Sequence, residues 1–186
     1  MKRISTIILI ALMVCGVVAT AQMPEPRKPG TEEKNLAYFV GNWKMDGDLK
    51  AGPMGPGGKF TGTERDEWLP GDFYLVSHSE GSSPMGNEIA LAIIGYDPAK
   101  KVYTYDAYNN MGQAEHATGA FDGTTWTWNS DMNMGGKNMK GRFIIKETSP
   151  TSYDFKFEMS EDGNTWTSAM DGKASKAGAG AATRKK

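Results

Sequence analysis

From residue 42 onward, apolar and polar residues alternate with the two-residue period of a β-strand that is buried on one face. The clearest example is the stretch 153–159, in which Tyr153, Phe155, Phe157 and Met159 alternate with charged residues. The same pattern, interrupted by turn residues, predicts about ten strands. Their expected ranges are 42–50, 58–68, 72–80, 88–96, 101–108, 113–121, 124–131, 138–147, 152–160 and 165–173.

Short turns of two alternating kinds link these strands. One set is compact and built from Pro, Gly, Asp and Ser, at 69–72, 97–100, 122–123 and 149–152. The other set is mostly longer and glycine-rich, at 51–57, 81–87, 109–112 and 132–137. Short connections indicate antiparallel neighbours, and closing such a sheet removes its exposed edges. We therefore predict an all-β fold, a single antiparallel up-and-down barrel with one tight end and one open end.

A Met-Gly dipeptide occurs in each of the longer turns, at Met54, Met85, Met111 and Met134. Since alternate turns of an up-and-down sheet lie at the same end, these methionines are expected to gather around one mouth of the barrel. Flexible thioether side chains form an adaptable apolar surface. Soft sulfur ligands also select copper(I). The rim is therefore a candidate ligand entrance and, alternatively, a candidate copper(I) site.

A short helix is predicted before the first strand. Thr31 is the expected N-cap, and two glutamates follow in the first turn, where acidic side chains suit the helix dipole. Leu36, Phe39 and Val40 have helical spacing, and Gly41 stands where the helix should end. The pattern indicates a small amphipathic helix that closes one end of the barrel.

The N-terminus has the pattern of a secretory signal: Lys2 and Arg3, an apolar run over 7–18, and a small-residue cleavage site at 19–21. The alternative is a lipoprotein anchored through Cys15, although Val14 is not the small residue that such a motif requires. We expect a secreted or periplasmic protein. Its expected parts are a signal peptide over 1–21, a linker over 22–30, the barrel domain over 31–173 and a disordered basic tail over 174–186.

Charge and cysteine content exclude several classes of function. The formal net charge is −1 with no basic face, so nucleic acid is not an expected partner. A membrane-spanning helix needs roughly 20 apolar residues, and no segment of that length is present, so no membrane span is expected. Cys15 is the only cysteine, so removal of the signal would leave no disulfide, thiolate metal site or cysteine nucleophile.

The stretch 36–43, Leu-Ala-Tyr-Phe-Val-Gly-Asn-Trp, resembles the opening of calycins, the superfamily of lipocalins and fatty-acid-binding proteins. There a short helix leads into a Gly-x-Trp on the first strand, and the indole closes the barrel floor. Over about residues 32–173 the chain also looks like the bacterial domain-of-unknown-function family fifteen-seventy-nine. The residues that carry this second resemblance are Gly62, Thr63, Glu64, Leu69, Gly71, Gly95, Tyr96, Asp97, Pro98, Arg142 and Trp166.

The resemblance implies a lipocalin-like barrel but no established activity. It also implies a basic residue late in the barrel that packs over the floor tryptophan, Trp43. The last predicted strand ends with Lys173, which is the candidate for that contact. Lysine lacks the planar stacking surface of arginine, so the contact is expected to be weaker than in lipocalins.

Two carboxylates lie on one face of the second predicted strand. Phe60, Gly62, Glu64, Asp66 and Trp68 share that face, and the aromatic residues suggest that it points inward. Burying two carboxylates is costly unless they are paired or solvated. A strand bulge or a polar lumen is one explanation. The other is a polar anchor or a general base for a bound ligand.

The histidines, His78 and His116, give weak signals. Ser77 and Ser79 flank His78, but neighbouring strand residues point to opposite faces, so they do not form a nucleophile–base pair with it. A haem-binding barrel resembling nitrobindin would need a late histidine, and none follows His116. The segment 162–164 lacks the ligand spacing of a calcium loop. We therefore expect no cofactor and no resident metal, and assign no catalytic residue.

Three functions remain open: binding of a small apolar or amphipathic molecule in the barrel, acid–base catalysis by Glu64 or Asp66 with His116, and copper(I) binding at the methionine rim. The first is favoured because aromatic-rich concave sites with a few polar groups are the general form of ligand pockets. The residues expected to line or guard this site are Trp43, Glu64, Trp68, His78, Tyr105, His116, Trp128, Arg142, Phe143 and Phe157.

Overall fold

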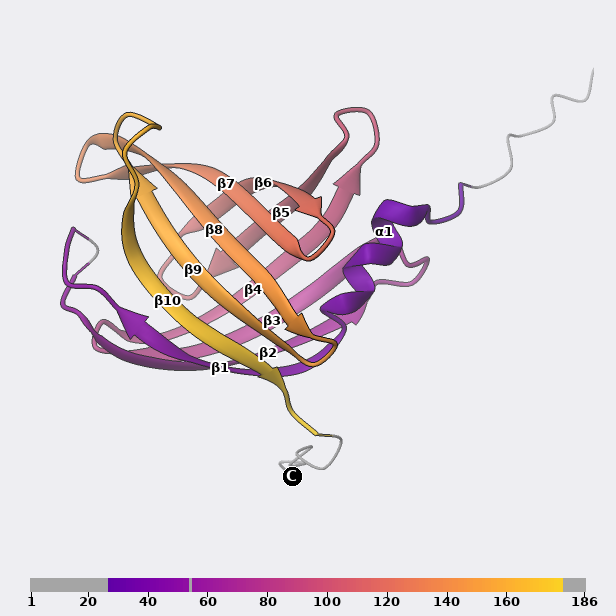
Figure 1. Cartoon of the computed structure of the whole chain (residues 1–186), viewed down its shortest axis with the longest axis horizontal. Coiled ribbons are helices and arrows are strands. Elements are labelled where there is room, and N and C mark those ends of the chain that lie inside the picture. Colours follow the sequence, from indigo (N-terminus) through magenta and orange to yellow (C-terminus); the bar gives the residue numbers. More distant parts are fainter. Residues whose placement is uncertain (1–26, 54, 179–186) are drawn as a thin grey trace, which may run out of the picture.

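The computed structural model of the chain describes residues 27–53 and 55–178. Ten antiparallel strands form a barrel, and one short helix, α1 (Thr31–Asn35), covers one end of it (Figure 1). A single 3-10 turn, Leu36–Tyr38, connects the helix to the first strand. The strands are β1 (Gly41–Leu49), β2 (Gly58–Trp68), β3 (Tyr74–Ser83), β4 (Gly86–Asp97), β5 (Val102–Asn109), β6 (Ala114–Asp122), β7 (Thr125–Met134), β8 (Lys137–Ser149), β9 (Ser152–Ser160) and β10 (Thr167–Lys176).

The barrel closes through β1, which pairs with β2 on one side and with β10 on the other. Every other strand pairs with its neighbours in sequence, so the predicted up-and-down barrel is confirmed. The alternate turns form two ends. The compact turns lie at the end covered by α1, here called the floor, and the Met-Gly turns lie at the opposite end, the mouth.

The helix is capped differently from the prediction. Gly30, not Thr31, is the N-cap, because the helix already begins at Thr31. The Gly30 N–H donates to Glu33 Oε2 at 2.7 Å, and Glu33 also pairs with Arg27. Glu33 is therefore buried at 1% exposure with its carboxylate satisfied. Its neighbours Leu36 and Phe39 are fully buried on the same side, as the helical spacing predicted.

Trp43 seals the floor, which confirms the calycin-like expectation for this residue. Its side chain is 1% exposed, and its Nε1 donates to the Phe39 carbonyl at 2.6 Å. The Lys176 ammonium lies 5.0 Å from the centre of the indole ring. The prediction that Lys173 makes this contact is wrong. Strand β10 continues to Lys176, which pairs with Trp43, while Lys173 points outward 4.0 Å from Asp154.

The extent of β10 also corrects the domain boundary. Residues 174–176 belong to the barrel wall, whereas the sequence predicted that the tail begins at Ala174. The predicted signal peptide and the last residues of the tail, 179–186, lie outside the described residues, as does Met54. Among the described residues, no helix has the length and apolar character needed to cross a membrane.

The interior differs between the two ends of the barrel. At the floor, inward-facing side chains such as Leu75, Tyr103 and Trp126 are completely or almost completely buried. Toward the mouth, inward-facing residues on the same strands, such as Ser79, Tyr105 and Met132, are only half-buried although the wall encloses them. The floor is therefore closely packed, whereas several inward-facing side chains of the mouth half, here called the lumen, retain partial exposure to solvent.

One seam of the wall is open near the mouth. Pairing between β6 and β7 ends at Ala117 and Ser130. Beyond that point Asp131–Met134 of β7 bond only to β8, and β6 continues past Ala117 to the mouth beside β5. Backbone pairing across this seam is therefore absent toward the rim, next to the inward-facing Glu115.

Candidate functional site

Glu64 and Asp66 project from β2 into the barrel, one above the other. Glu64 is opposite Trp43 in the register with β1, and Asp66 is one pleat closer to the floor. Glu64 is half-buried and reaches the solvent-accessible lumen, whereas Asp66 is 2% exposed. This confirms that the β2 face with the carboxylates points inward. The two acids stand at the bottom of the lumen, where the packed floor begins.

Asp66 has no hydrogen-bond partner among the described residues for either carboxylate oxygen. The buried hydroxyl of Ser77 lies on β3 directly across from it in the register. No group of three histidine, cysteine, aspartate or glutamate side chains in the described part of the chain is arranged to hold a metal ion. Glu64 and Asp66 are therefore two neighbouring acids on one strand face.

Burial raises the pKa of both carboxyl groups. For Asp66, burial and the adjacent Glu64 charge raise the pKa to about 9, with the Lys176 charge and Ser77 opposing the shift. For Glu64, burial is the largest cause of the raised pKa, and the adjacent Asp66 and Ser77 side chains oppose it. Like-charged neighbours in a site of low polarity cannot both ionise cheaply. At neutral pH the pair therefore keeps at least one proton.

Aromatic side chains from the far wall surround the acids. Burial, followed by the Glu64 charge, raises the pKa of Tyr105 on β5 and of Tyr153 on β9. Both phenols are therefore neutral at physiological pH. The Tyr153 hydroxyl donates to Met45 Sδ at 3.9 Å, and the Tyr105 ring lies 6.0 Å from that of Trp128. Trp128 is held over Gly119, where an added Cβ would come within 2.6 Å of the indole.

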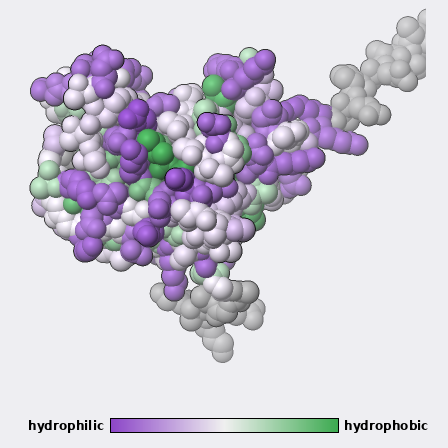
Figure 2. Space-filling view, viewed as in Figure 1, coloured by the Kyte–Doolittle hydropathy of each residue, from purple (hydrophilic) through white to green (hydrophobic). Residues whose placement is uncertain are grey.

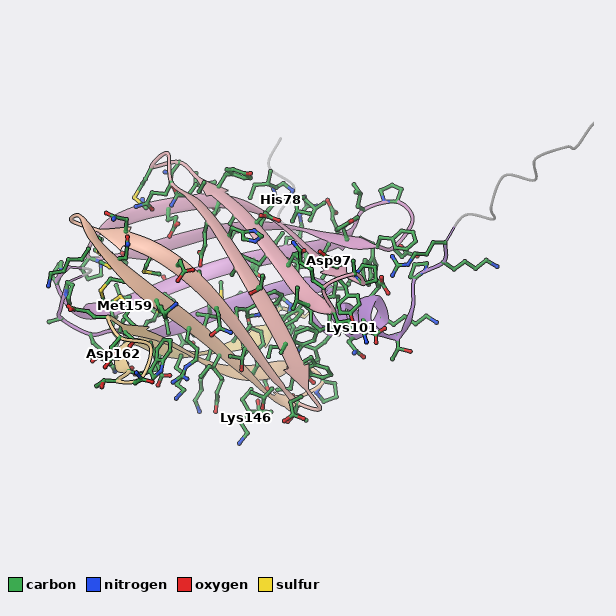
Figure 3. All side chains as sticks on the ribbon, turned by 90° about the horizontal axis from the view of Figure 1, so that it is seen from above. His78, Asp97, Lys101, Lys146, Met159 and Asp162 are labelled. Atoms are coloured by element: carbon green, nitrogen blue, oxygen red, sulfur yellow. The ribbon has the colours of Figure 1, made fainter. Side chains whose placement is uncertain are left out.

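Above this layer the lumen is lined by phenylalanine and methionine. Phe143 and Phe157, both predicted to line the site, face inward from β8 and β9 with ring centres 6.5 Å apart. A second cluster of buried residues, separate from the floor core, surrounds Phe157. The methionines in or against this cluster are Met132, Met134, Met139, Met159 and Met170. In Figure 3, Met159 lies toward the end with Asp162, away from Asp97 and Lys101 beside α1.

The rim methionines do not form one group. Met85 and Met111 are exposed on their turns, at 48% and 57%. Met134, by contrast, turns inward against the Phe157 cluster. A Cβ on Gly55 would lie 2.9 Å from Met85 Sδ, so the turn after β1 lies against the turn after β3. The methionines that converge are thus strand residues, among them Met134 and the nearby Met132 and Met139 that were expected close to the rim.

His78, His116 and Arg142 were predicted to guard the lumen, and this expectation is wrong. All three lie on the outer face of their strands, because each is one residue out of phase with the inward positions. His116 Nδ1 is 2.6 Å from Asp106 Oδ1 on the outside of β5. Catalysis that pairs His116 with Glu64 or Asp66 is therefore incompatible with the fold.

Trp43 and Trp68 lie in or against the floor core and do not reach the open lumen. Of the predicted residues, the structure brings Glu64, Tyr105, Trp128, Phe143 and Phe157 together around one space. The sequence did not single out Ser77, Glu115 and Tyr153, which belong to the same interior. The strand alternation marks Tyr153 as inward-facing, but its nearness to the acids depends on closure of the barrel between β10 and β1.

The outer wall carries a separate groove of about 740 Å³ across β8, β9, β10, β1 and β2. Figure 2 shows a small apolar patch enclosed by hydrophilic residues on the face that carries β8 to β10. Charged residues line the groove, but several are already paired, including Lys59 with Asp48 and Lys50 with the lining residue Asp171. Lys146, at its border, extends away from the wall (Figure 3). The groove lacks an unsatisfied buried polar group.

Comparison with known proteins supports the sequence resemblance. A family model described as "Protein of unknown function (DUF1579)" matches residues 28–176, which is most of the chain. The chain belongs to this family. Its predicted lipocalin-like barrel is confirmed, and the family description supplies no activity.

Most of the residues by which the chain resembles its DUF1579 relatives have structural roles. Asp97 Oδ1 accepts hydrogen bonds from the backbone N–H groups of Ala99 and Lys100 in the turn after β4. The Arg142 guanidinium lies 4.0 Å from the Trp166 ring centre, and its Nε donates to Glu158 at 3.0 Å. These contacts fix turns and strands on the outside. Glu64 is the exception, since it stands inside the lumen with no structural partner of that kind.

Similar solved structures are barrels of low sequence identity. The crystal structure of Rv2717c from M. tuberculosis matches with a TM-score of 0.55 and 9% identity, covering 80% of this chain and 98% of that one. The structure of EF1p2_mFAP2b bound to DFHBI matches with a TM-score of 0.44 and 11% identity, covering 79% of this chain and all of the other. The first likeness shows the fold alone, and the second is too low in TM-score to support the fold. The search of curated proteins found no match.

Proposed function

We propose that the protein is an exported barrel that binds a small apolar or amphipathic molecule in the mouth half of its lumen. The contrast between the two halves of the interior carries this proposal. The floor residues are fully buried, whereas Tyr105, Phe143 and Met132 are half-buried inside a closed wall. Apolar side chains held open to solvent are unfavourable unless something covers them. An apolar ligand would cover them.

The composition of the lumen suits such a ligand. Aromatic rings and methionines form most of its wall, and a few polar groups lie at its base. Ligand pockets have this form, with an apolar lining that provides affinity and convergent polar groups that fix orientation. The methionine side chains can adjust to ligands of different shape.

A lumen-filling variant tests this proposal. Ala90 faces inward on β4, so Ala90→Trp should fill the mouth half and weaken uptake of phenylnaphthylamine, a neutral fluorescent probe, by about tenfold or more. The matched control is Ala120→Trp, which adds the same ring on the outer face of β6. Equal probe binding by both folded variants would contradict a lumenal site. Native mass spectrometry of protein from its own host would identify a retained molecule directly.

Export is the second part of the proposal and rests on the signal-like N-terminus alone. Cleavage after Ala21 should leave Gln22 as the first residue of the mature chain. Intact-mass analysis of the protein recovered from its host measures this. A diacylglycerol adduct on Cys15 would instead identify a lipoprotein.

A further inference from the structure

Asp66 is a buried acid whose partner is missing. Buried polar atoms in folded proteins almost always have a hydrogen-bond partner, and each exception calls for an explanation. Asp66 is 2% exposed, and both of its oxygens lack a partner among the described residues. Its neighbour Glu64 faces the solvent-accessible lumen directly above it. A donor that arrives through the lumen would satisfy these oxygens.

The ionisable groups around the pair make the lumen acidic. Between rim and floor, the inward-facing acids of the described strands include Glu64, Asp66, Glu88 and Glu115. The inward-facing base among the described residues at those levels is Lys176, and its ammonium lies over the rings of Trp43 and Tyr38 on the floor. Lys176 therefore lies on the floor, and although its charge partly offsets that of Asp66, the inward-facing acids outnumber it. A carboxylate ligand, such as a fatty acid, would meet like charge.

The other groups near Asp66 are neutral. Ser77 faces it from β3, and burial keeps the phenols of Tyr105 and Tyr153 in their neutral form. Aromatic faces attract cations, more strongly where water is excluded. The rings of Tyr105 and Trp128 stand at this level of the lumen, 6.0 Å apart. The aromatic wall of the lumen therefore favours a ligand that carries both a cationic group and a hydrocarbon part.

We propose that the ligand is an apolar amine whose ammonium group binds Glu64 and Asp66 at the base of the lumen, with its hydrocarbon part against the aromatic and methionine wall above. This inference rests on the proposed lumenal binding function and names the chemical class of its ligand. The ammonium supplies the N–H donors that Asp66 lacks. Its charge stabilises the ionised form of the carboxyl pair.

Binding of the ammonium should release a proton. In the free protein the Glu64–Asp66 pair retains at least one proton, under the influence of burial, their mutual repulsion, Ser77, Tyr105, Tyr153 and Lys176. An ammonium beside the pair favours the charged carboxylate, so the carboxyl O–H bond breaks and the proton passes to the buffer. No covalent bond forms between ligand and protein. A neutral or anionic ligand has no reason to displace that proton.

Three probes with one hydrocarbon body and different head groups test the inference: naphthylmethylamine, naphthylmethanol and naphthoate. Isothermal titration calorimetry at neutral pH should show the amine binding about tenfold or more tightly than the alcohol, with naphthoate the weakest. Repeating the amine titration in buffers of different ionisation enthalpy should reveal release of up to about one proton per amine bound.

Variants of the pair separate the inference from the proposed function. Asp66→Asn and Glu64→Gln should each weaken the amine by about tenfold and leave the alcohol within about threefold. Asp66→Asn should also reduce the proton release. Asp131→Asn is the same change at an exposed residue on the outer face of β7. It should alter neither the amine affinity nor the proton release.

Each outcome has a defined meaning. If the amine and the alcohol bind equally, or if Asp66→Asn leaves the amine unaffected, the amine inference is overturned while the lumenal binding function stands. Tightest binding by naphthoate would overturn it in favour of an acidic ligand. If none of the three probes binds and Ala90→Trp has no effect on phenylnaphthylamine, both proposals fail.

Discussion

Two carboxyl groups, one under the floor and one at the base of the lumen, both expose almost no surface to solvent and have opposite surroundings. Glu33 is 1% exposed and accepts hydrogen bonds from the Gly30 N–H and from Arg27. Burial raises its pKa, but these donors outweigh burial and hold the pKa below the ordinary value. Asp66 is 2% exposed, no described residue donates a hydrogen bond to it, and burial beside Glu64 raises its pKa. The two groups therefore differ in their hydrogen-bond donors and in how deeply the barrel encloses them.

The difference distinguishes structure from function. An acid that is satisfied within the chain contributes to folding, whereas an unsatisfied one costs stability. Proteins retain groups that lower their stability mainly at functional sites. The same division separates the solid floor around Trp43 from the half-buried wall around Phe143. The variants below test that division.

The largest effect is expected at the floor. Trp43→Ala removes a ring buried at 1% exposure and leaves a cavity beside Phe39 and Tyr153, so the free energy of unfolding should fall by about 3–5 kcal/mol. Phe143→Ala, in the half-buried wall, should cost clearly less. Urea unfolding followed by circular dichroism measures both. A loss below about 1 kcal/mol for Trp43→Ala would contradict the assignment of the floor as the stabilising half.

Glu33→Gln should lower stability next. The amide keeps the shape but loses the charge that Arg27 and the Gly30 N–H bind, so a loss of about 1–3 kcal/mol at neutral pH is expected. Because the folded pKa is lowered, the carboxylate's contribution exists above the unfolded pKa and disappears as the pH falls. The difference between the original protein and Glu33→Gln should therefore shrink in acid. A constant difference across pH would show that charge is not the cause.

Asp66→Asn should act in the opposite direction. The raised pKa keeps Asp66 protonated in the folded protein, while the unfolded chain ionises it above about pH 4. Stability should therefore fall as the pH rises from about 4 toward 9, by up to about 1.4 kcal/mol per pH unit for one group. Asp66→Asn should remove part of that slope and stabilise the protein by about 1–2 kcal/mol at pH 8. Destabilisation at pH 8 would show that Asp66 is a structural group like Glu33.

The smallest effect is expected at the mouth. Replacing Met54, Met85, Met111 and Met134 by leucine keeps volume and apolarity but removes sulfur, so uptake of phenylnaphthylamine should change by no more than about threefold. The copper(I) alternative predicts a different result. Anaerobic competition with a copper(I) chelator would then show tight binding by the original protein and none by the variant. That outcome would move the functional region from the lumen to the rim.

The sequence predicted the barrel well because its period of two, its turn chemistry and its helix-to-Gly-x-Trp opening all agree. The inward face of β2, with Glu64 and Asp66, also follows from the pattern. His78, His116 and Arg142 were expected at the ligand site but lie on the outer face, and the pattern left the inward face of 138–147 open. A strand pattern separates two faces, but it identifies the inner one only where large apolar residues mark it.

The composition of the site could not be derived from local pattern. Tyr105 and Tyr153 lie more than forty residues apart in the chain and surround Glu64 only because the barrel closes. Which lysine lies over Trp43, the predicted Lys173 or the observed Lys176, depends on the register between β1 and β10. Register is set by both paired strands and cannot be read from one of them. Strand β10 extends three residues beyond its predicted end at Lys173, and only this extension reaches the floor.

The titration of Asp66 itself tests the account most directly. Carbon-13 NMR of the Asp66 carboxyl, assigned by comparison with Asp66→Asn, should give a pKa far above the ordinary value in the free protein, near 9. Saturating naphthylmethylamine should bring that pKa below neutrality, because the ammonium donates to the ionised carboxylate. An ordinary pKa in the free protein, or a raised pKa that the amine leaves unchanged, would contradict the claim that Asp66 is held without a partner for a cationic ligand.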